Sequence, residues 1–282
     1  MQLVKTKKEL RSQLDNTPFP KRGIGLVPTM GALHRGHLAL VEQAILENDL
    51  VVVSIFINPT QFNNKKDLES YPKTLKQDLS MLHRVQGELL VFAPLVSEMY
   101  GGTVASRIYN FDGLDKVMEG SYRPGHFNGV GTIVEELLLL VKPDRAYFGE
   151  KDFQQLQIIR KMVANRKLPV EIIGCPIVRE KGGLALSSRN ERLSVRLRRE
   201  ASFIYGTLKT AKAKFGTKSA RYVVDWVRRQ FKNHPDLDLE YVEIADVDTL
   251  TPVMRKRKNI KYRAFIAVYA NGVRLIDNIA LN

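Results

Sequence analysis

Two histidines, His34 and His37, lie three residues apart where a short apolar run gives way to a predicted helix. At this spacing both imidazoles lie on one side of the first helical turn. The N-terminus of a helix favours phosphate, so the pair could donate hydrogen bonds to phosphate and stabilise a leaving pyrophosphate. A metal site would need a third ligand, and the chain's other histidines are His83, His126 and His234. Satisfied structural histidines are the other alternative, but the preceding strand and the nearby glycines favour phosphate chemistry.

The elements that would position these histidines alternate through roughly the first 180 residues. β-branched and apolar runs predict strands at 23–28, 50–56, 89–93, 145–148 and 170–178, and the stretches between them predict helices at 36–48, 72–86, 128–141 and 152–165. This alternation predicts a Rossmann-like α/β domain, with a parallel sheet covered by helices on both faces. Ligands bind at the carboxyl ends of such strands, so chemistry is expected in the loops after Val27, Phe56 and Phe148.

The sequence pattern changes after about residue 189. Two amphipathic stretches predict helices at 194–215 and 219–231, and three later stretches predict strands at 239–245, 264–270 and 273–280. Asn271-Gly272, between the last two strands, predicts a hairpin turn because both positions can take positive φ. We therefore expect a larger domain over residues 1–178 and a smaller α+β domain over residues 179–282.

Composition limits the class of protein. Apolar residues make up 44% of the chain and charged residues 26%, values typical of soluble globular proteins. No apolar run approaches the length of a transmembrane helix, and lysines occupy the positions where a secretory signal would be apolar. The single cysteine, Cys175, excludes an internal disulfide and a cysteine zinc site. We therefore expect a cytoplasmic protein without a membrane partner.

The net charge of +14 raises the alternative of a nucleic-acid-binding protein. The excess is concentrated from Glu191 onward, where 19 basic residues face 10 acidic ones, and its densest run is 255–258. Aromatic residues are not clustered with this run, as a platform for stacking single-stranded bases would require. We therefore interpret the run as a solvated loop and expect no nucleic-acid partner.

The element His34-Arg35-Gly36-His37 resembles the signature of the nucleotidyltransferase superfamily that includes class I aminoacyl-tRNA synthetases. Four further segments follow it in order, at 56–62, 123–127, 148–156 and 184–190. Together the five segments are similar to those of the pantoate–β-alanine ligases, or pantothenate synthetases. The resemblance spans about residues 23–190, and the length of the family fits the whole chain.

The resemblance implies an ATP-dependent ligation in two steps. The carboxylate of pantoate attacks the α-phosphate of ATP, which carries Mg²⁺, and gives pantoyl adenylate and pyrophosphate. The amine of β-alanine then attacks the acyl carbon and releases AMP and pantothenate, a precursor of coenzyme A. The resemblance also implies a homodimer and a smaller domain that closes over the nucleotide site. It identifies no metal ligand in the protein.

The same resemblance implies roles for individual residues. His37 would be the proton donor, with His34 and Lys151 as further catalytic residues. Gln61 and Gln155 would bind pantoate, and Gln61 would also bind β-alanine. The ATP-binding residues would be Met30, Gly31, Ala32, Leu33, His34, Arg35, Gly36, His37, Gly149, Glu150, Lys151, Asp152, Val178, Leu186, Ser187, Ser188 and Arg189.

These residue types suit those roles on physical grounds. The amides of Gln61 and Gln155 can donate to and accept from a hydroxy acid without acting as nucleophiles. Lys151 offers a point charge for phosphates, whereas Arg189 offers a planar fork of donors beside two serines. Each residue taken alone could instead have a purely structural role. The glutamines could lie on the surface, Lys151 could form an ordinary salt bridge, and the segment at Arg189 could be a turn that links the domains.

Three other polar residues have weaker signals, and two positions depart from the family. Arg123 and His126 lie in one loop and are expected to line the pocket. Asp78 lies on a predicted helix, where a solvated carboxylate is favoured over a magnesium ligand. The family usually has an acidic residue before the glycine of its Gly-Leu-Ala segment, where this chain has Lys181-Gly182-Gly183, and Leu186 stands where methionine is common. Neither departure removes a group that the chemistry needs.

Two alternative functions use part of the same sequence. A nucleotidyltransferase that leaves the adenylate on its product would need His34 and His37, but it has no evident use for Gln61 and Gln155. A nucleic-acid-binding protein with a vestigial synthetase-like core would use the basic tail. A steep salt dependence of retention on nucleic acid would distinguish it.

Overall fold

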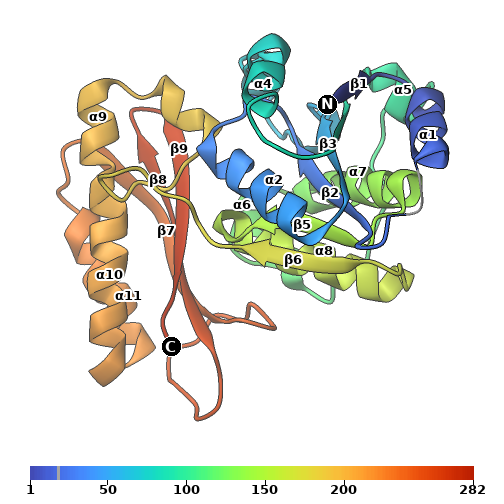
Figure 1. Ribbon diagram of the computed structural model, residues 1–282. Coiled ribbons are helices and arrows are strands. Elements are labelled where there is room, and N and C mark those ends of the chain that lie inside the picture. The colour runs from blue at the N-terminus through green and yellow to red at the C-terminus, as the bar shows by residue number, and fades with distance from the viewer. Residues whose placement is uncertain (18–19) are drawn as a thin grey trace. The chain divides into compact units, whose positions relative to one another are not determined.

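The computed structural model describes residues 1–17 and 20–282, which form two compact units (Figure 1). The first unit comprises Met1–Asp115, Glu119–Glu150 and Gln155–Pro176, and the second comprises Lys116–Met118, Lys151–Gln154 and Ile177–Asn282. The main division falls between Pro176 and Ile177, and two short segments from the expected first domain belong to the second unit. Within the described ranges, no helix is long and apolar enough to cross a membrane.

The first unit is built on a sheet of six parallel strands (Figure 1). In spatial order they are β1 (Gln2–Val4), β4 (Leu89–Phe92), β3 (Leu50–Ile55), β2 (Ile24–Thr29), β5 (Arg145–Gly149) and β6 (Glu171–Cys175). From β2 the chain proceeds through β3 to β4 on one side, and then crosses to β5 and β6 on the other. The strand order therefore reverses between β2 and β5, and ligands bind at the carboxyl ends of strands at such a point. The predicted Rossmann-like fold class is confirmed.

Both faces of this sheet are buried, which accounts for the nearly continuous apolar sequence of β3. Val51 and Val53 pack in one hydrophobic cluster with Leu40 and Val41. Val52 points to the opposite face, because side chains alternate along a strand, and it is equally buried. A strand covered on both sides can be apolar at every position.

The helices of the first unit connect and cover the strands. They are α1 (Lys7–Asn16), α2 (Arg35–Glu47), α3 (Lys65–Glu69), α4 (Leu75–Leu82), α5 (Val96–Tyr100), α6 (Glu119–Tyr122), α7 (His126–Val141) and α8 (Phe153–Arg166), and the first two residues of α8 belong to the second unit. Helix α2 packs against β2, β3 and β5, and α7 packs against β2 and α1. Short 3-10 turns are η1 (Pro59–Gln61), η2 (Leu114–Lys116) and η3 (Glu150–Asp152).

The first unit differs from the sequence prediction in several places: the short helices α3, α5 and α6 were not predicted, and the strand expected over 170–178 ends at Cys175. The helix expected from Pro72 begins at Leu75, with Thr74 as its N-cap residue. The Thr74 side chain does not cap the helix, because its hydroxyl donates to the carboxylate of Asp78. Strand β1 and helix α1 were not predicted, although α1 begins with a capping box in which Thr6 and Glu9 satisfy each other's backbone N–H groups.

The second unit combines helices with an antiparallel sheet of three strands, in the order β7 (Leu237–Asp246), β8 (Tyr262–Ala270) and β9 (Val273–Ala280). Asn271 and Gly272 have φ values of 46° and 78°, which confirms the predicted hairpin turn. Its helices are α9 (Val195–Glu200), α10 (Ser202–Thr217) and α11 (Ala220–Phe231). The single helix expected over 194–215 is thus divided at Ala201, whose carbonyl oxygen accepts from the N–H of Ile204 in a tightened turn.

The basic run at 255–258 lies in a loop of the second unit, as the sequence predicted. The Nζ of Lys256 donates a hydrogen bond to the carbonyl oxygen of Phe215 at 2.5 Å, in the last turn of α10. A cation at this position is favoured by the helix dipole. At least this member of the run therefore has a structural partner.

Candidate active site

The two histidines close the N-terminus of α2 at the carboxyl end of β2. His34 is the N-cap residue, and its Nδ1 accepts from the N–H of Gly36 at 3.1 Å. The Nδ1 of His37 accepts from the N–H of His34 at 3.3 Å. The rings stack with centroids 4.0 Å apart. Because each Nδ1 accepts a hydrogen bond, each neutral ring carries its proton on Nε2, which is therefore a donor.

The backbone before the histidines is held by Asp78, a residue of α4. Its Oδ1 accepts from the N–H of Leu33 at 2.8 Å, and its Oδ2 accepts from the N–H of Ala32 at 3.1 Å. The hydroxyl of Thr74 donates to the same carboxylate at 3.2 Å. Asp78 is 1% exposed, so the expectation of a solvated helix carboxylate is wrong. Three hydrogen bonds compensate the buried charge in place of water.

Residues 30–33 adopt a conformation that depends on a glycine. Gly31 has a φ of 79°, and the following residue, Ala32, has a φ of 49°. A Cβ on Gly31 would also come within 3.1 Å of both Asp78 and Ile55. This left-handed backbone points successive N–H groups toward Asp78, and it leads directly into the cap made by His34.

Gln61 ends the 3-10 turn η1, which follows β3. Its side chain is buried, its Oε1 accepts from the Nδ2 of Asn58 at 3.2 Å, and its Nε2 contacts the Sδ of Met30. The same Nδ2 of Asn58 donates to the carbonyl oxygen of Gly129 at 3.0 Å. Gly129 lacks room for a side chain, because a Cβ would lie 2.4 Å from the carbonyl oxygen of Thr60. This close approach fixes η1 against α7.

Asn58 is a site residue to which sequence reasoning assigns no role. Its Oδ1 accepts from the hydroxyl of Tyr100 at 2.5 Å and from the hydroxyl of Thr60 at 3.0 Å. With both ends of its amide engaged, Asn58 sets the orientation of the Gln61 amide. The signal for it was the Asn-Pro dipeptide directly after a strand, a common way to start a turn.

Arg123 and His126 hold the main chain of Gln61. The Nδ1 of His126 lies 2.7 Å from the carbonyl oxygen of Gln61, and an Nη of Arg123 donates to the same oxygen at 3.3 Å. His126 is buried at the start of α7. These contacts give both residues a supporting role behind Gln61. The second predicted pantoate ligand, Gln155, is half-buried in the first turn of α8, which follows β5.

The other predicted nucleotide ligands divide between the two units. Gly149 ends β5 and Glu150 follows it, both in the first unit with Met30 to His37. Lys151 and Asp152 belong to the second unit. The side chain of Lys151 is 18% exposed, and its Nζ lies 3.8 Å from the carboxylate of Asp152.

Residues 178–186 form a small hairpin in the second unit. The N–H of Leu186 donates to the carbonyl oxygen of Val178 at 3.0 Å, so these two predicted ATP ligands are paired. Gly183, in the turn, has a φ of 97°, and a Cβ there would come within 2.7 Å of the Tyr205 ring. Gly183, the glycine of the Gly-Leu-Ala segment, is therefore required by packing against α10.

Ser187, Ser188 and Arg189, which were predicted to bind ATP, follow this hairpin. The last two lie in an ordered 3-10 turn, η4 (Ser188–Arg192). The Oγ of Ser187 caps it by accepting from the N–H of Arg189 at 3.3 Å. Asn190 is buried, and its Nδ2 donates to Glu180 and to the carbonyl oxygen of Ala185, each at 3.0 Å. This segment thus has a defined internal structure.

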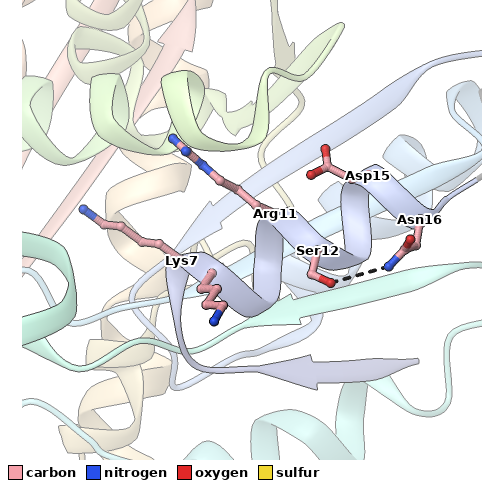
Figure 2. Close-up of a pocket in the computed structure, with 6 residues that line it drawn as sticks. Lys7, Arg11, Ser12, Asp15 and Asn16 are labelled. Atoms are coloured by element: carbon pink, nitrogen blue, oxygen red, sulfur yellow. Dashed lines mark hydrogen bonds between the residues drawn. The ribbon is translucent and has the colours of Figure 1, made fainter.

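An open groove beside α1 is lined by none of the predicted site residues. Figure 2 shows Lys7 and Arg11 extending from the helix, with Asp15 and Asn16 one turn further along. Among the described residues, no group of three or more histidine, cysteine or acidic side chains is arranged to hold a metal ion.

Comparisons with known proteins identify the family of the chain over nearly its whole length. The family model described as pantoate-beta-alanine ligase matches residues 2–280. The chain belongs to the pantoate–β-alanine ligase family. It is a ligase that joins pantoate and β-alanine, as the resemblance predicted.

Relatives of this ligase extend over its full length. The pantothenate synthetase of Christiangramia forsetii is 55% identical over 282 residues, covering 100% of both chains. That of Bacteroides thetaiotaomicron is 48% identical, covering 99% of this chain and 98% of its own. The structure of the Thermus thermophilus pantothenate synthetase is 43% identical, has a TM-score of 0.91, and covers 100% of this ligase and 99% of that chain.

One related structure was solved with ligands. The pantoate-beta-alanine ligase of Francisella tularensis is 35% identical and has a TM-score of 0.81, covering 100% of this ligase and 98% of that chain. It is a complex with β-γ ATP and β-alanine.

Proposed function

We propose that this ligase uses ATP to condense pantoate with β-alanine through a pantoyl adenylate. A carboxylate oxygen of pantoate attacks the α-phosphorus of ATP, and the bond to the bridging oxygen breaks to release pyrophosphate. The amine of β-alanine then attacks the acyl carbon, the bond from that carbon to the AMP oxygen breaks, and the amine loses a proton. The products are pantothenate, AMP and pyrophosphate.

The observation that carries this proposal is the contact between Gln61 and Met30. Gln61 is the proposed pantoate ligand, and Met30 begins the segment proposed to bind ATP. This contact supports the proposal, because attack of a carboxylate on the α-phosphate requires the pantoate ligand and the ATP-binding segment to be neighbours. Holding reactants in this way removes much of the entropic cost of a reaction between two bound molecules.

His34 and His37 act on the pyrophosphate that leaves. With Nδ1 occupied by backbone N–H groups, each neutral ring presents an Nε2–H donor. These donors and the positive end of the α2 dipole stabilise the negative charge that grows on the bridging oxygen. In this scheme His37 donates a hydrogen bond from its Nε2–H to the bridging oxygen and keeps the proton, and His34 holds the oxygen and orients its neighbour.

Lys151, Ser187, Ser188 and Arg189 bind the phosphates of ATP. The lysine gives a point charge and the arginine a planar pair of donors, which together match a triphosphate. Mg²⁺ arrives with ATP as part of the substrate, since this ion is usually bound through substrate phosphates with one or two carboxylates. Asp78 is not offered as its ligand, because the carboxylate already accepts three hydrogen bonds.

The ligase acts as a homodimer joined through the first unit, in our proposal. The N–H groups of Arg107 and Tyr109 donate to the side chains of Thr132 and Asn128 on α7, at 2.8 and 3.1 Å. Ile108 lies between them and is 88% exposed. An isoleucine so placed suits an interface with a second copy. Sedimentation velocity should give about twice the chain mass, and a purely monomeric species would contradict the dimer.

We assign the ligase to the cytoplasm because ATP, its proposed co-substrate, is maintained there. Cell fractionation that recovered the chain with the membranes or outside the cell would overturn this assignment.

The order of product release tests the proposed reaction. Wild-type enzyme mixed with Mg²⁺-ATP and pantoate should release pyrophosphate before β-alanine is added, and AMP should appear only afterwards. Release of pyrophosphate only in the presence of β-alanine would contradict a separate adenylation step. If AMP stayed attached to the final product, the chain would be a nucleotidyltransferase instead.

A further inference from the structure

Two adjacent residues of β9 contact both phosphate-binding segments of the second unit. The Nδ2 of Asn278 donates to the backbone carbonyl oxygen of Lys151 at 2.9 Å. The carboxylate of Asp277 accepts from both Nη atoms of Arg179, at 2.6 and 2.9 Å. Arg179 directly follows Val178, one of the proposed ATP ligands. Lys151 and the hairpin that precedes Arg189 are therefore tied to the same place on one strand.

Both the nitrogen and the oxygen of the Asn278 amide are hydrogen-bonded. It is 2% exposed, and its Oδ1 accepts from an Nη of Arg263 at 2.5 Å. The guanidinium of Arg263 lies over the ring of Phe153, with its carbon 4.0 Å from the centroid. Phe153 also contacts Phe265 on β8, with centroids 6.0 Å apart. The main chain at 151–153 is thus held to the sheet by one hydrogen bond and by ring packing.

The guanidinium of Arg179 holds the hairpin in a similar way. Besides the bidentate pair with Asp277, one Nη donates to the carbonyl oxygen of Gly183 at 3.1 Å. The guanidinium also stacks on the ring of Tyr205, with its carbon 3.7 Å from the centroid. The turn of the hairpin is therefore fixed to both β9 and α10. The hairpin ends at Leu186, and Ser187 is the next residue along the chain.

We infer that Asp277 and Asn278 are positioning residues that set Lys151 and the turn carrying Arg189 at a fixed spacing. Neither residue is offered as a ligand of ATP. The inference rests on the proposed function, because it gives these two residues the task of holding two groups that bind one triphosphate. Displacement of such a group by about 1 Å can cost roughly 100-fold in rate.

The substitution Asn278→Asp isolates one of these contacts. Aspartate keeps the oxygen that accepts from Arg263, but it has no N–H to donate to the carbonyl oxygen of Lys151. Single-turnover release of pyrophosphate should slow about 10- to 100-fold, with KM for pantoate unchanged within about twofold. Glu240→Gln is a matched control, since it weakens another ion pair of β9, with Arg274, away from Lys151.

A double-mutant cycle with Lys151→Ala separates positioning from general stability. If Asn278 acts through Lys151, Asn278→Asp should slow pyrophosphate release in the wild-type background, with little further loss in the Lys151→Ala background. The second readout is the affinity for α,β-methylene ATP, measured by calorimetry, which should follow the same pattern. Asn278→Ala, which introduces no charge, repeats the cycle should the aspartate variant fail to fold.

Equal losses in both backgrounds would overturn the inference, and so would wild-type rates for both Asn278 variants. Failure of the wild-type enzyme to release pyrophosphate from ATP and pantoate would instead contradict the proposed function. The two failures are therefore distinguishable.

Discussion

The Nδ1 of His37 accepts a hydrogen bond from the backbone N–H of His34 at 3.3 Å, so the second histidine fixes the residue that caps the helix. Each residue of the pair thereby serves both the helix end and the proposed chemistry. In the neutral ring the proton lies on Nε2 while Nδ1 is the acceptor. Structure and catalysis can be separated by a side chain that keeps the cap and lacks the imidazole.

His37→Gln should retain the cap, because glutamine at the third helical position can accept from the N–H of the N-cap residue. It should nevertheless slow pyrophosphate release about 10²- to 10⁴-fold, the usual contribution of a general-acid or charge-stabilising group. His37→Ala should be equally slow. Single-turnover measurements of pyrophosphate release test both variants, and His83→Ala, at an exposed position, is the control. A near wild-type rate of release in either His37 variant would remove His37 from the mechanism.

Asp78→Asn should weaken the backbone of the ATP-binding segment. One amide oxygen can still accept from Leu33, but the NH₂ group would then face the N–H of Ala32. We expect a loss of about 1–3 kcal/mol in the free energy of unfolding, as for a buried donor left unsatisfied. KM for ATP should also rise more than KM for pantoate.

Urea denaturation and steady-state kinetics measure these two effects of Asp78→Asn. Asp15→Asn, on the exposed side of α1, is the control and should change neither. Unaltered stability of the Asp78 variant would mean that its hydrogen bonds to the segment contribute little.

Gln61→Ala and Gln155→Ala should each weaken pantoate binding and leave ATP affinity within a few-fold. Removing one amide from the hydrogen bonding of a hydroxy acid should cost about 1–3 kcal/mol. Calorimetric titration of each ligand measures the difference, with Gln77→Ala as the exposed control. A larger loss for ATP than for pantoate would reverse the assignment of the two glutamines.

Arg189→Lys should recover only part of the activity that Arg189→Ala loses, because a point charge cannot replace two coplanar donors. ATP should slow hydrogen exchange over residues 180–190 in the wild-type enzyme, and Arg189→Ala should abolish that protection. Arg192→Ala, in the same 3-10 turn, is the control. The same exchange with and without ATP would identify the segment as an ordinary linker.

Glu135 should make the stability of the first unit depend on acid pH. Burial alone would raise the pKa of Glu135, but hydrogen bonds from Tyr109 and Arg107 and the charge of Arg166 hold that pKa below its usual value. A carboxyl with a lowered folded pKa stabilises the fold above its unfolded pKa of about 4.3. That contribution is lost as the pH falls through the lower folded pKa.

Urea denaturation at several pH values between 7 and 3 tests this linkage. Glu135→Gln should be less stable than wild type at pH 7, and the difference should shrink below about pH 4. The control, Glu42→Gln, lies at an exposed position of α2. A difference between Glu135→Gln and wild type that stayed constant with pH would exclude titration of Glu135 as the cause.

The sequence predicted the strands and the main helices of both units because their signals are local. A fully buried strand such as β3 is apolar throughout, and Asn271-Gly272 specifies its own turn. The short edge strand β1 lacks such a signal, since three residues give no period. The break at Ala201 depends on tertiary packing around a residue that is itself a good helix former.

The site was predicted as a set of segments, and its supporting residues were not. Asp78 resembles any helix carboxylate in the sequence, because its partners are backbone N–H groups 45 and 46 residues away. Asn58 and Asn278 act through similarly distant carbonyl groups. Spacing along the chain reveals residues that meet within one turn of helix, whereas contacts of this range appear only once the sheets have formed.

Transfer of oxygen from pantoate to AMP tests the central claim most directly. Pantoate with ¹⁸O in both carboxylate oxygens should give AMP with one ¹⁸O on its phosphate, because the attacking oxygen stays on phosphorus when β-alanine displaces the acyl group. Pantothenate should retain the other ¹⁸O in its amide carbonyl, and mass spectrometry of both products would record this. Unlabelled AMP, with ¹⁸O in inorganic phosphate or fully retained in the acyl group, would contradict an adenylate intermediate.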